Sequence, residues 1–248
     1  MIETKLDGRV LNVTLNRPAR RNALTMEMCE QLLAAFDRAN DDPGIGAVFL
    51  QGHGPSFCSG MDLEEALTAD ENQLSSLHER LFTASTWLRK PMVAWVHGAV
   101  VAGGTGLAAQ AHVVYASTDA TFGLTEIRVG LWPFLIYRAI AAAIGERRAT
   151  EWSLSGRIVP AEEAKQSGLV TTICQYPLQY ADERAKLLAG YSANVIAKGL
   201  EYTERIRAMT WEEAGKLAWT MRNEMLAHPD FTEGVQAFKQ KRAPVWTK

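Results

Sequence analysis

PMVAWVHGAVVAGGTGLAAQ, residues 91–110, is the stretch of sequence that decides the fold class. Residues 91–97 are an apolar run of the length expected for a buried strand. Residues 98–110 form a glycine-rich turn that leads into a helix of small residues. Because His97, Gln110 and the following His112 interrupt the apolar region, it predicts buried core and not a membrane span.

Strand and helix patterns alternate on both sides of this stretch. A helix is predicted from residue 25 to residue 40, because Met28, Leu32 and Phe36 recur at helical spacing. Further helices are predicted at residues 62–88, 133–145, 146–155 and 160–168. Strands are predicted at residues 10–15, 47–50, 113–116 and 121–123. This alternation of strand, loop and helix predicts an α/β fold.

The composition changes near residue 177 and divides the chain into two regions. We expect a core over residues 1–178 and a helical C-terminal region over residues 179–248. Large aromatic side chains in the otherwise polar C-terminal region need burial against some surface. They are Trp211, Trp219 and Phe238.

Composition and charge narrow the function classes. The chain has 248 residues, of which 47% are hydrophobic and 22% are charged, as is usual for soluble globular proteins. Its net charge of −2 provides no broad basic field, so nucleic acid is not an expected partner. A local basic patch is still compatible with a phosphorylated small molecule.

Cysteines, histidines and the N-terminus indicate a cytoplasmic protein without a bound metal. The N-terminal residues 1–8 are charged and do not resemble a signal peptide. Cysteines without paired spacing fit a reducing cytoplasm; they are Cys29, Cys58 and Cys174. Histidines without metal-ligand spacing argue against a metal site; they are His53, His78, His97, His112 and His228.

The first segment that suits catalysis is FCSGMDL, residues 57–63. Its small residues lie between a predicted strand and the start of a helix. Backbone N–H groups in such a turn lack partners and bind an anion or a developing oxyanion. The alternative is an ordinary turn between a strand and a helix, which is common.

The second segment is AGGTG, residues 102–106. Its glycines allow the backbone to approach a ligand closely. The spacing matches neither the phosphate-binding loop nor the dinucleotide-binding glycine pattern. The alternative is a helix that packs closely against its neighbour.

The third segment is TFGLTE, residues 121–126, which ends in Glu126. Apolar residues follow, among them Ile127, Val129 and Leu131, and they predict a dry pocket around the carboxylate. Removal from water raises the pKa of a carboxyl group and makes it a usable base. The alternative is a solvated glutamate in the first turn of a helix.

These segments, taken in order, resemble the crotonase superfamily of enoyl-CoA hydratases and isomerases. The resemblance covers essentially the whole chain and implies an α/β fold, a crotonase-like spiral of ββα repeats with a helical C-terminal region used in trimerisation. Other matching segments are NRP at 16–18, NAL at 22–24, LSGR at 154–157, AEEA at 161–164, GLV at 168–170 and the tail from 231 to 246.

The resemblance also implies a substrate and a site. The substrate would be an acyl-CoA thioester, and no separate cofactor is expected because coenzyme A is part of the substrate. The N–H groups of Met61 and Gly103 would form an oxyanion hole for the enolate, and Glu126 would be the catalytic base. The assembly implied is a homotrimer or a hexamer. Substrate-binding positions carried over from the family are Arg20, Ser59, Met61, Leu63 and Gly103.

The sequence departs from the family hydratases at a position that matters for the reaction. Those enzymes resemble one another in carrying a second glutamate, at the position of Gly106 here, and Ala102 replaces the first glycine of their triplet. One carboxylate suffices to move a proton from C2 to C4, whereas holding and deprotonating water is done well by two. The Pro133-Phe134 pair also resembles family isomerases. We therefore expect isomerisation of 3-enoyl-CoA to 2-enoyl-CoA, with Glu126 as the single base.

Another chemistry of the family, such as decarboxylation or ring opening, stays open, and so do two further alternatives. One is an enoyl-CoA hydratase in which another group or an ordered water replaces the missing glutamate. The other is an acyl-CoA-binding subunit without catalysis, against which the retained Glu126 argues. His97, where the family commonly has asparagine, is expected to be a buried or turn histidine. Candidates for an apolar pocket are Leu67, Trp87, Trp132 and Phe134.

Overall fold

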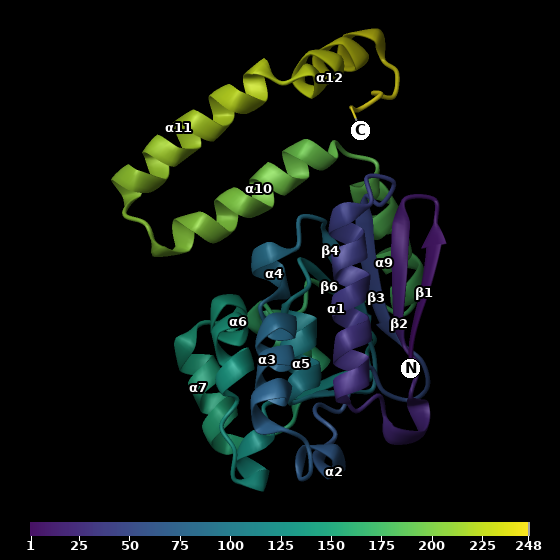
Figure 1. Ribbon diagram of the computed structural model, residues 1–248, viewed down its shortest axis with the longest axis vertical. Helices are drawn as coiled ribbons and strands as arrows, with labels where there is room; N and C mark the ends of the chain where they lie inside the picture. The colour runs from purple at the N-terminus through teal and green to yellow at the C-terminus, as the bar shows by residue number, and fades with distance from the viewer. Residues whose placement is uncertain (248) are drawn as a thin grey trace.

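The computed structural model describes residues 1–247, and within them six strands form the main sheet in the order β1-β2-β3-β4-β6-β9 (Figure 1). β1 runs antiparallel to β2, and the other neighbours in this sheet are parallel. The strands are β1 (Ile2–Asp7), β2 (Val10–Leu15), β3 (Ala47–Gly52), β4 (Met92–Val96), β6 (Val113–Ala116) and β9 (Thr172–Ile173). The strands expected at residues 10–15, 47–50, 91–97 and 113–116 are thereby confirmed.

A smaller sheet positions the site. Over the same described residues it contains β5 (Ala99–Val101), β7 (Thr121–Gly123) and β8 (Val159–Pro160), in the order β5-β7-β8. β5 and β7 are parallel, and Val101 lies opposite Gly123. The strand expected at residues 121–123 is confirmed. The chain segments that follow β5 and β7 therefore leave this sheet side by side.

Helices cover both faces of the main sheet, as the alternation of side chains along its strands requires. On β2, Leu11 and Val13 belong to the apolar cluster that includes α1 (Met26–Asp41), as predicted from its helical spacing. Val10 and Phe49 belong to the opposite cluster, which includes alanines of α9 (Pro177–Ala189). Packing of this kind on two faces confirms the α/β class.

The remaining helices lie between β3 and β9 in the sequence or follow α9. Those between β3 and β9 are α2 (Leu63–Ala66), α3 (Glu71–Phe82), α4 (Ala84–Trp87), α5 (Gly103–Ala109), α6 (Phe134–Ile144), α7 (Glu146–Ser155) and α8 (Ala161–Ser167). Short 3₁₀ helices are η1 (Pro18–Arg20), η2 (Glu126–Val129) and η3 (Ile206–Ala208). The C-terminal helices are α10 (Ala193–Arg205), α11 (Trp211–Ala227) and α12 (Pro229–Gln240).

Figure 1 shows that α10, α11 and α12 lie at one end of the molecule, with α11 and α12 away from the sheet. The boundary expected between residues 178 and 179 falls inside α9, whose Ala181 and Ala185 pack against the sheet. The helices that leave the core therefore begin at α10. No helix within residues 1–247 combines the length and the apolar character needed to cross a membrane.

Candidate active site

Three chain segments from different parts of the sequence run side by side at the site. The N–H of Cys58 donates to the carbonyl of Ala99 at 3.2 Å, and the N–H of Val101 donates to the carbonyl of Cys58 at 3.1 Å. The N–H of Leu24 donates to the carbonyl of Gly60 at 2.7 Å. These bonds hold the segment that ends in Met61 against the end of β5.

The turn at Gly60 needs a glycine for two reasons. Its φ of +94° lies in the left-handed region, and a Cβ there would come within 2.8 Å of the Cβ of Ala102. Ala102 itself has φ 51° and ψ −124°, a conformation that non-glycine residues rarely adopt. Such local strain is typical of functional sites, and here it sets the direction of the next N–H, that of Gly103.

The sequence predicts that the N–H groups of Met61 and Gly103 bind an oxyanion. Within residues 1–247, neither donates to a backbone carbonyl outside the regular elements or to a side chain. A Cβ added to Gly103 would lie 3.7 Å from the nitrogen of Met61, so the two turns are in contact. Both residues line the same cavity, of about 580 Å³. Two unpaired donors that meet at a cavity suit a developing oxyanion.

Glu126 reaches this cavity because β5 and β7 are parallel neighbours. β5 leads directly to Gly103, and β7 leads to Glu126 at the start of η2. The N–H of Ala102 donates to the carbonyl of Gly123 at 2.8 Å and fixes the two ends together. The strand ends therefore bring Gly103 and Glu126 to one cavity, which Met61 also lines.

The carboxyl group of Glu126 lies in a dry environment. Its Oε2 is buried and has no hydrogen-bond partner among residues 1–247. Burial raises the pKa of Glu126 from 4.5 to about 7. At neutral pH the group is thus divided between its acid and base forms, which suits a residue that accepts and then returns a proton.

The place of the family's other glutamate is filled by an apolar side chain. A Cβ added to Gly106 would lie 2.2 Å from Cγ2 of Ile136 and 2.7 Å from its Cβ. Ile136 belongs to α6, is buried, and also lines the cavity. The position is therefore closed to any side chain unless α6 moves or Ile136 is replaced.

Most of the predicted site residues line the cavity, together with others that sequence reasoning did not name. Ser59, Leu63, Trp132 and Phe134 line it, whereas Leu67 is 87% exposed and is not part of it. Trp87 is outside the cavity and packs against the core instead. Lining residues that were missed include Leu74, His78 and Phe82 of α3. The four-residue spacing of His78 and Phe82 places both on one helix face, which is the signal that was available.

The chain is similar to known proteins in both sequence and fold. The family described as Enoyl-CoA hydratase/isomerase matches residues 5–248. The chain belongs to this family. A putative enoyl-CoA hydratase of Thermus thermophilus is 38% identical over 247 residues, which are 96% of this chain and 97% of that protein. A 2,3-dehydroadipyl-CoA hydratase of Escherichia coli is 31% identical, over 95% of this chain and 94% of that protein.

Solved structures of the family have the same fold. An enoyl-CoA hydratase of Mycobacterium smegmatis superimposes with a TM-score of 0.91 and 30% identity, over 99% of this chain and 98% of that chain. A putative enoyl-CoA hydratase of Streptomyces coelicolor superimposes with a TM-score of 0.92 and 26% identity, over 99% and 94%. The crotonase fold expected from the resemblance is therefore confirmed. The chain is an enzyme of the enoyl-CoA hydratase/isomerase family, which acts on acyl-CoA thioesters.

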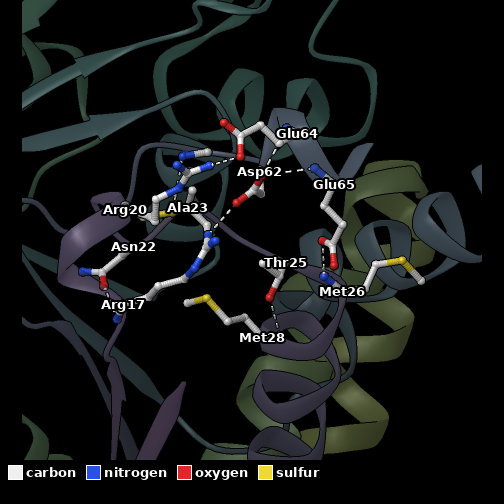
Figure 2. A network of polar contacts seen from close by, with 12 residues as sticks. Arg17, Arg20, Asn22, Ala23, Thr25, Met26, Met28, Asp62, Glu64 and Glu65 are labelled. Atoms are coloured by element: carbon white, nitrogen blue, oxygen red, sulfur yellow. Dashed lines mark hydrogen bonds and ion pairs between the residues drawn. The ribbon is translucent and has the colours of Figure 1, made fainter. Parts of the chain in front are cut away.

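In this family member, a polar network fixes the turn that carries Met61 (Figure 2). Arg17 donates to Asp62 at 2.6 Å, and Asp62 caps α2 by accepting from the N–H groups of Glu64 and Glu65. The hydrogen bond from Arg17 holds the pKa of Asp62 below its usual range. The carboxylate therefore stays ionised next to Met61 and keeps the turn in place.

Arg20 lies beside this network but does not line the cavity. Its guanidinium forms an exposed ion pair with Glu64 (Figure 2). The role in substrate binding that the resemblance implies stays a prediction for this residue. An exposed ion pair of this kind contributes little to stability.

His97 lies away from the cavity of this enzyme. Its Nε2 is 2.8 Å from the carbonyl oxygen of Gly54, and its ring stacks on Trp95 with the centroids 4.6 Å apart. His97 is thus a turn histidine held by a backbone contact, in line with the structural role expected from the sequence.

Proposed function

We propose that this chain isomerises 3-enoyl-CoA to 2-enoyl-CoA, with Glu126 as the single proton-transfer group. The proposal rests chiefly on the packing at Gly106: the side chain of Ile136 occupies the space that a second carboxylate at residue 106 would need. Glu71 also lines the cavity, but it lies at an exposed position at the start of α3. Glu126 is then the carboxyl group beside the oxyanion donors, and its raised pKa fits both halves of a proton transfer.

The reaction follows from this geometry. The thioester oxygen accepts hydrogen bonds from the N–H groups of Met61 and Gly103, and the Glu126 carboxylate removes a proton from C2. The electron pair of the C–H bond moves into the thioester, and a dienolate forms with its negative charge on the oxygen. Protonated Glu126 then donates the same proton to C4. The carbonyl re-forms, and the double bond lies between C2 and C3.

Oxyanion donors and acid–base groups make known contributions to the rate of such reactions. One oxyanion donor typically contributes about 10²–10³ in rate. A positioned acid–base group typically contributes about 10²–10⁴. Since both oxyanion donors are backbone groups, side-chain changes at Met61 should have milder effects than changes that move the turn.

A hydratase is the second candidate, and the names of the relatives favour it. The Thermus and Escherichia coli proteins are both named as hydratases. For this chain, hydration would require a group other than residue 106 to hold the water. The two candidates share the oxyanion hole and Glu126, and they differ in whether water is added.

The exposed C-terminal helices support a further part of the proposal, assembly as a homotrimer or a hexamer. Trp211 is 97% exposed, and Phe238 is 86% exposed. Aromatic side chains of this size on helices that leave the core are typical of surfaces that another subunit covers.

The experiment for the proposed reaction compares Glu126→Gln with Glu79→Gln. Glu79 is a glutamate on the exposed side of α3, so its replacement is the matched control. Conversion of 3-enoyl-CoA, followed by the absorbance of the conjugated product, should fall at least ~10²-fold in Glu126→Gln alone. Unchanged conversion in Glu126→Gln would remove Glu126 from the mechanism, and no turnover of any enoyl-CoA by the wild type would favour a binding subunit.

A further inference from the structure

The position of Glu126 depends on the backbone that carries it. Its Oε2 has no hydrogen-bond partner among residues 1–247, so no polar contact within them fixes this atom. Glu126 begins η2, a 3₁₀ helix of four residues, and a helix this short is not stable by itself. Neighbouring parts of the chain must therefore hold η2 in place.

Residues 156–158, which connect α7 to β8, pack against η2 and the end of β7. A Cβ added to Gly156 would lie 2.7 Å from Cγ2 of Ile127, the second residue of η2. A Cβ added to Gly123 would lie 2.8 Å from the carbonyl oxygen of Arg157. Gly156 has a φ of 57°, in the left-handed region, and turns the chain sharply at the end of α7. Since these contacts are close, a movement of residues 156–158 would move η2 with them.

The side chain of Arg157 joins the two helices that flank this connection. Its Nε and Nη2 donate to the two carboxylate oxygens of Glu151 in α7, at 2.8 Å and 2.9 Å. Its Nη1 donates to one carboxylate oxygen of Glu163 in α8 at 2.9 Å, and its Nη2 donates to the other. The planar guanidinium is thus held by two carboxylates at once, a geometry that the single ammonium of a lysine does not reproduce.

This cluster of three charged side chains stays ionised at neutral pH. The hydrogen bond from Arg157 is the main cause that holds the pKa of Glu151 below its usual range, and the pKa of Glu163 is lowered in the same way. All three side chains are more than a third exposed, and ion pairs with such exposure contribute little to stability. Bidentate pairs do restrict orientation, so the cluster acts mainly on the geometry of residues 156–158.

We propose that Arg157 is a positioning residue for Glu126: it joins α7 to α8, holds residues 156–158 against η2, and so fixes the carboxyl group at the cavity. Arg157 does not line the cavity, so it acts through the backbone and not on the substrate. The inference rests on the role proposed for Glu126 and holds for isomerisation and hydration alike. A displacement of a reacting group by about 1 Å can cost ~10²-fold in rate.

The test measures the pKa of Glu126 and the rate constants in Arg157→Met, Arg157→Lys and the control Arg80→Met. Arg80 donates to both carboxylate oxygens of Asp37, at 2.6 Å and 2.8 Å, and neither residue lines the cavity. Carbon nuclear magnetic resonance gives the pKa from the carboxyl signal that is lost in Glu126→Gln. Arg157→Met should admit water to Glu126 and move its pKa from about 7 toward 4.5.

Turnover provides an independent readout. In Arg157→Met, kcat on 3-enoyl-CoA should fall at least ~10-fold because the base is misplaced. KM should change less than about twofold, because Arg157 does not contribute to binding. Arg157→Lys keeps the charge but not the paired geometry, so both readouts should lie between those of Arg157→Met and the wild type. Arg80→Met should match the wild type in both.

The outcomes separate this inference from the proposed function. An unchanged pKa of Glu126 in Arg157→Met, or an unchanged kcat in a variant that only unfolds more easily, would overturn the positioning role. If Arg157→Met does not fold, Glu163→Gln, which removes one of the two carboxylates, decides by the same measurements. A wild type that turns over no enoyl-CoA would refute the proposed function, and the pKa of Glu126 alone would then decide the positioning role.

Discussion

Glu126→Gln should make the protein less active but more stable above neutral pH. Burial raises the folded-state pKa of Glu126 from 4.5 to about 7. Between these values the folded state binds more protons than the unfolded state, so the contribution of Glu126 to stability falls as the pH rises through this window. With about 1.4 kcal/mol for each pKa unit, the ionised group destabilises the fold by up to about 3 kcal/mol at pH 8.5. Glutamine keeps the shape without the charge.

The assay is urea unfolding of both proteins at pH 8.5 and pH 5. The variant should be more stable by up to about 3 kcal/mol at pH 8.5, and the difference should shrink to below about 1 kcal/mol at pH 5. Glu79→Gln, on the exposed side of α3, should show little difference at either pH. In the wild type, kcat/KM should rise with pH around 7, because the ionised form is the base. Equal stability differences at the two pH values would refute the buried, uncharged environment inferred for Glu126.

Three further predictions concern packing and assembly. Gly106→Ala would place a Cβ 2.2 Å from Ile136 Cγ2 and should destabilise the fold by about 1–3 kcal/mol. Ile136→Gly should relieve part of this destabilisation in the double variant. Strictly additive free energies of urea unfolding in the single and double variants would contradict the contact. Gly103→Val would add side-chain atoms between the oxyanion donors and Phe82 and should lower kcat/KM at least ~10²-fold, so normal turnover would exclude Gly103 from the site. Light scattering should give at least three times the chain mass of 27.4 kDa, and a monomer at micromolar concentration would contradict the assembly.

The pattern of apolar residues predicted the strands and helices that bury apolar side chains. β2 is buried along nearly its whole length and α1 buries one face, and the apolar residues of both are evident in the sequence. β1, in contrast, was not predicted, because as an edge strand it is exposed along most of its length and lacks an apolar pattern. The boundary near residue 178 was placed by composition alone, and only the contacts of α9 show that this helix belongs to the core.

The candidate site was predictable where several sequence motifs occur in the same order as in the family. Met61, Gly103 and Glu126 were predicted as site residues in this way, and in the structure all three line one cavity. The contact between Gly106 and Ile136 was not predictable, because it joins α5 to α6 across 30 positions of sequence. Residue types alone likewise leave His78 as one histidine among five, since its place on the cavity wall appears only in the folded structure.

The central claim is that one carboxylate, without a second at residue 106, makes this enzyme an isomerase. The most direct measurement offers 3-enoyl-CoA and 2-enoyl-CoA separately to the wild type and quantifies the 2-enoyl, 3-enoyl and 3-hydroxyacyl products by chromatography. The account predicts rapid formation of 2-enoyl-CoA from the 3-enoyl thioester and hydration slower by at least ~10²-fold, the lower range of a positioned acid–base group. Rapid hydration of 2-enoyl-CoA with no detectable isomerisation would contradict the account and establish the hydratase.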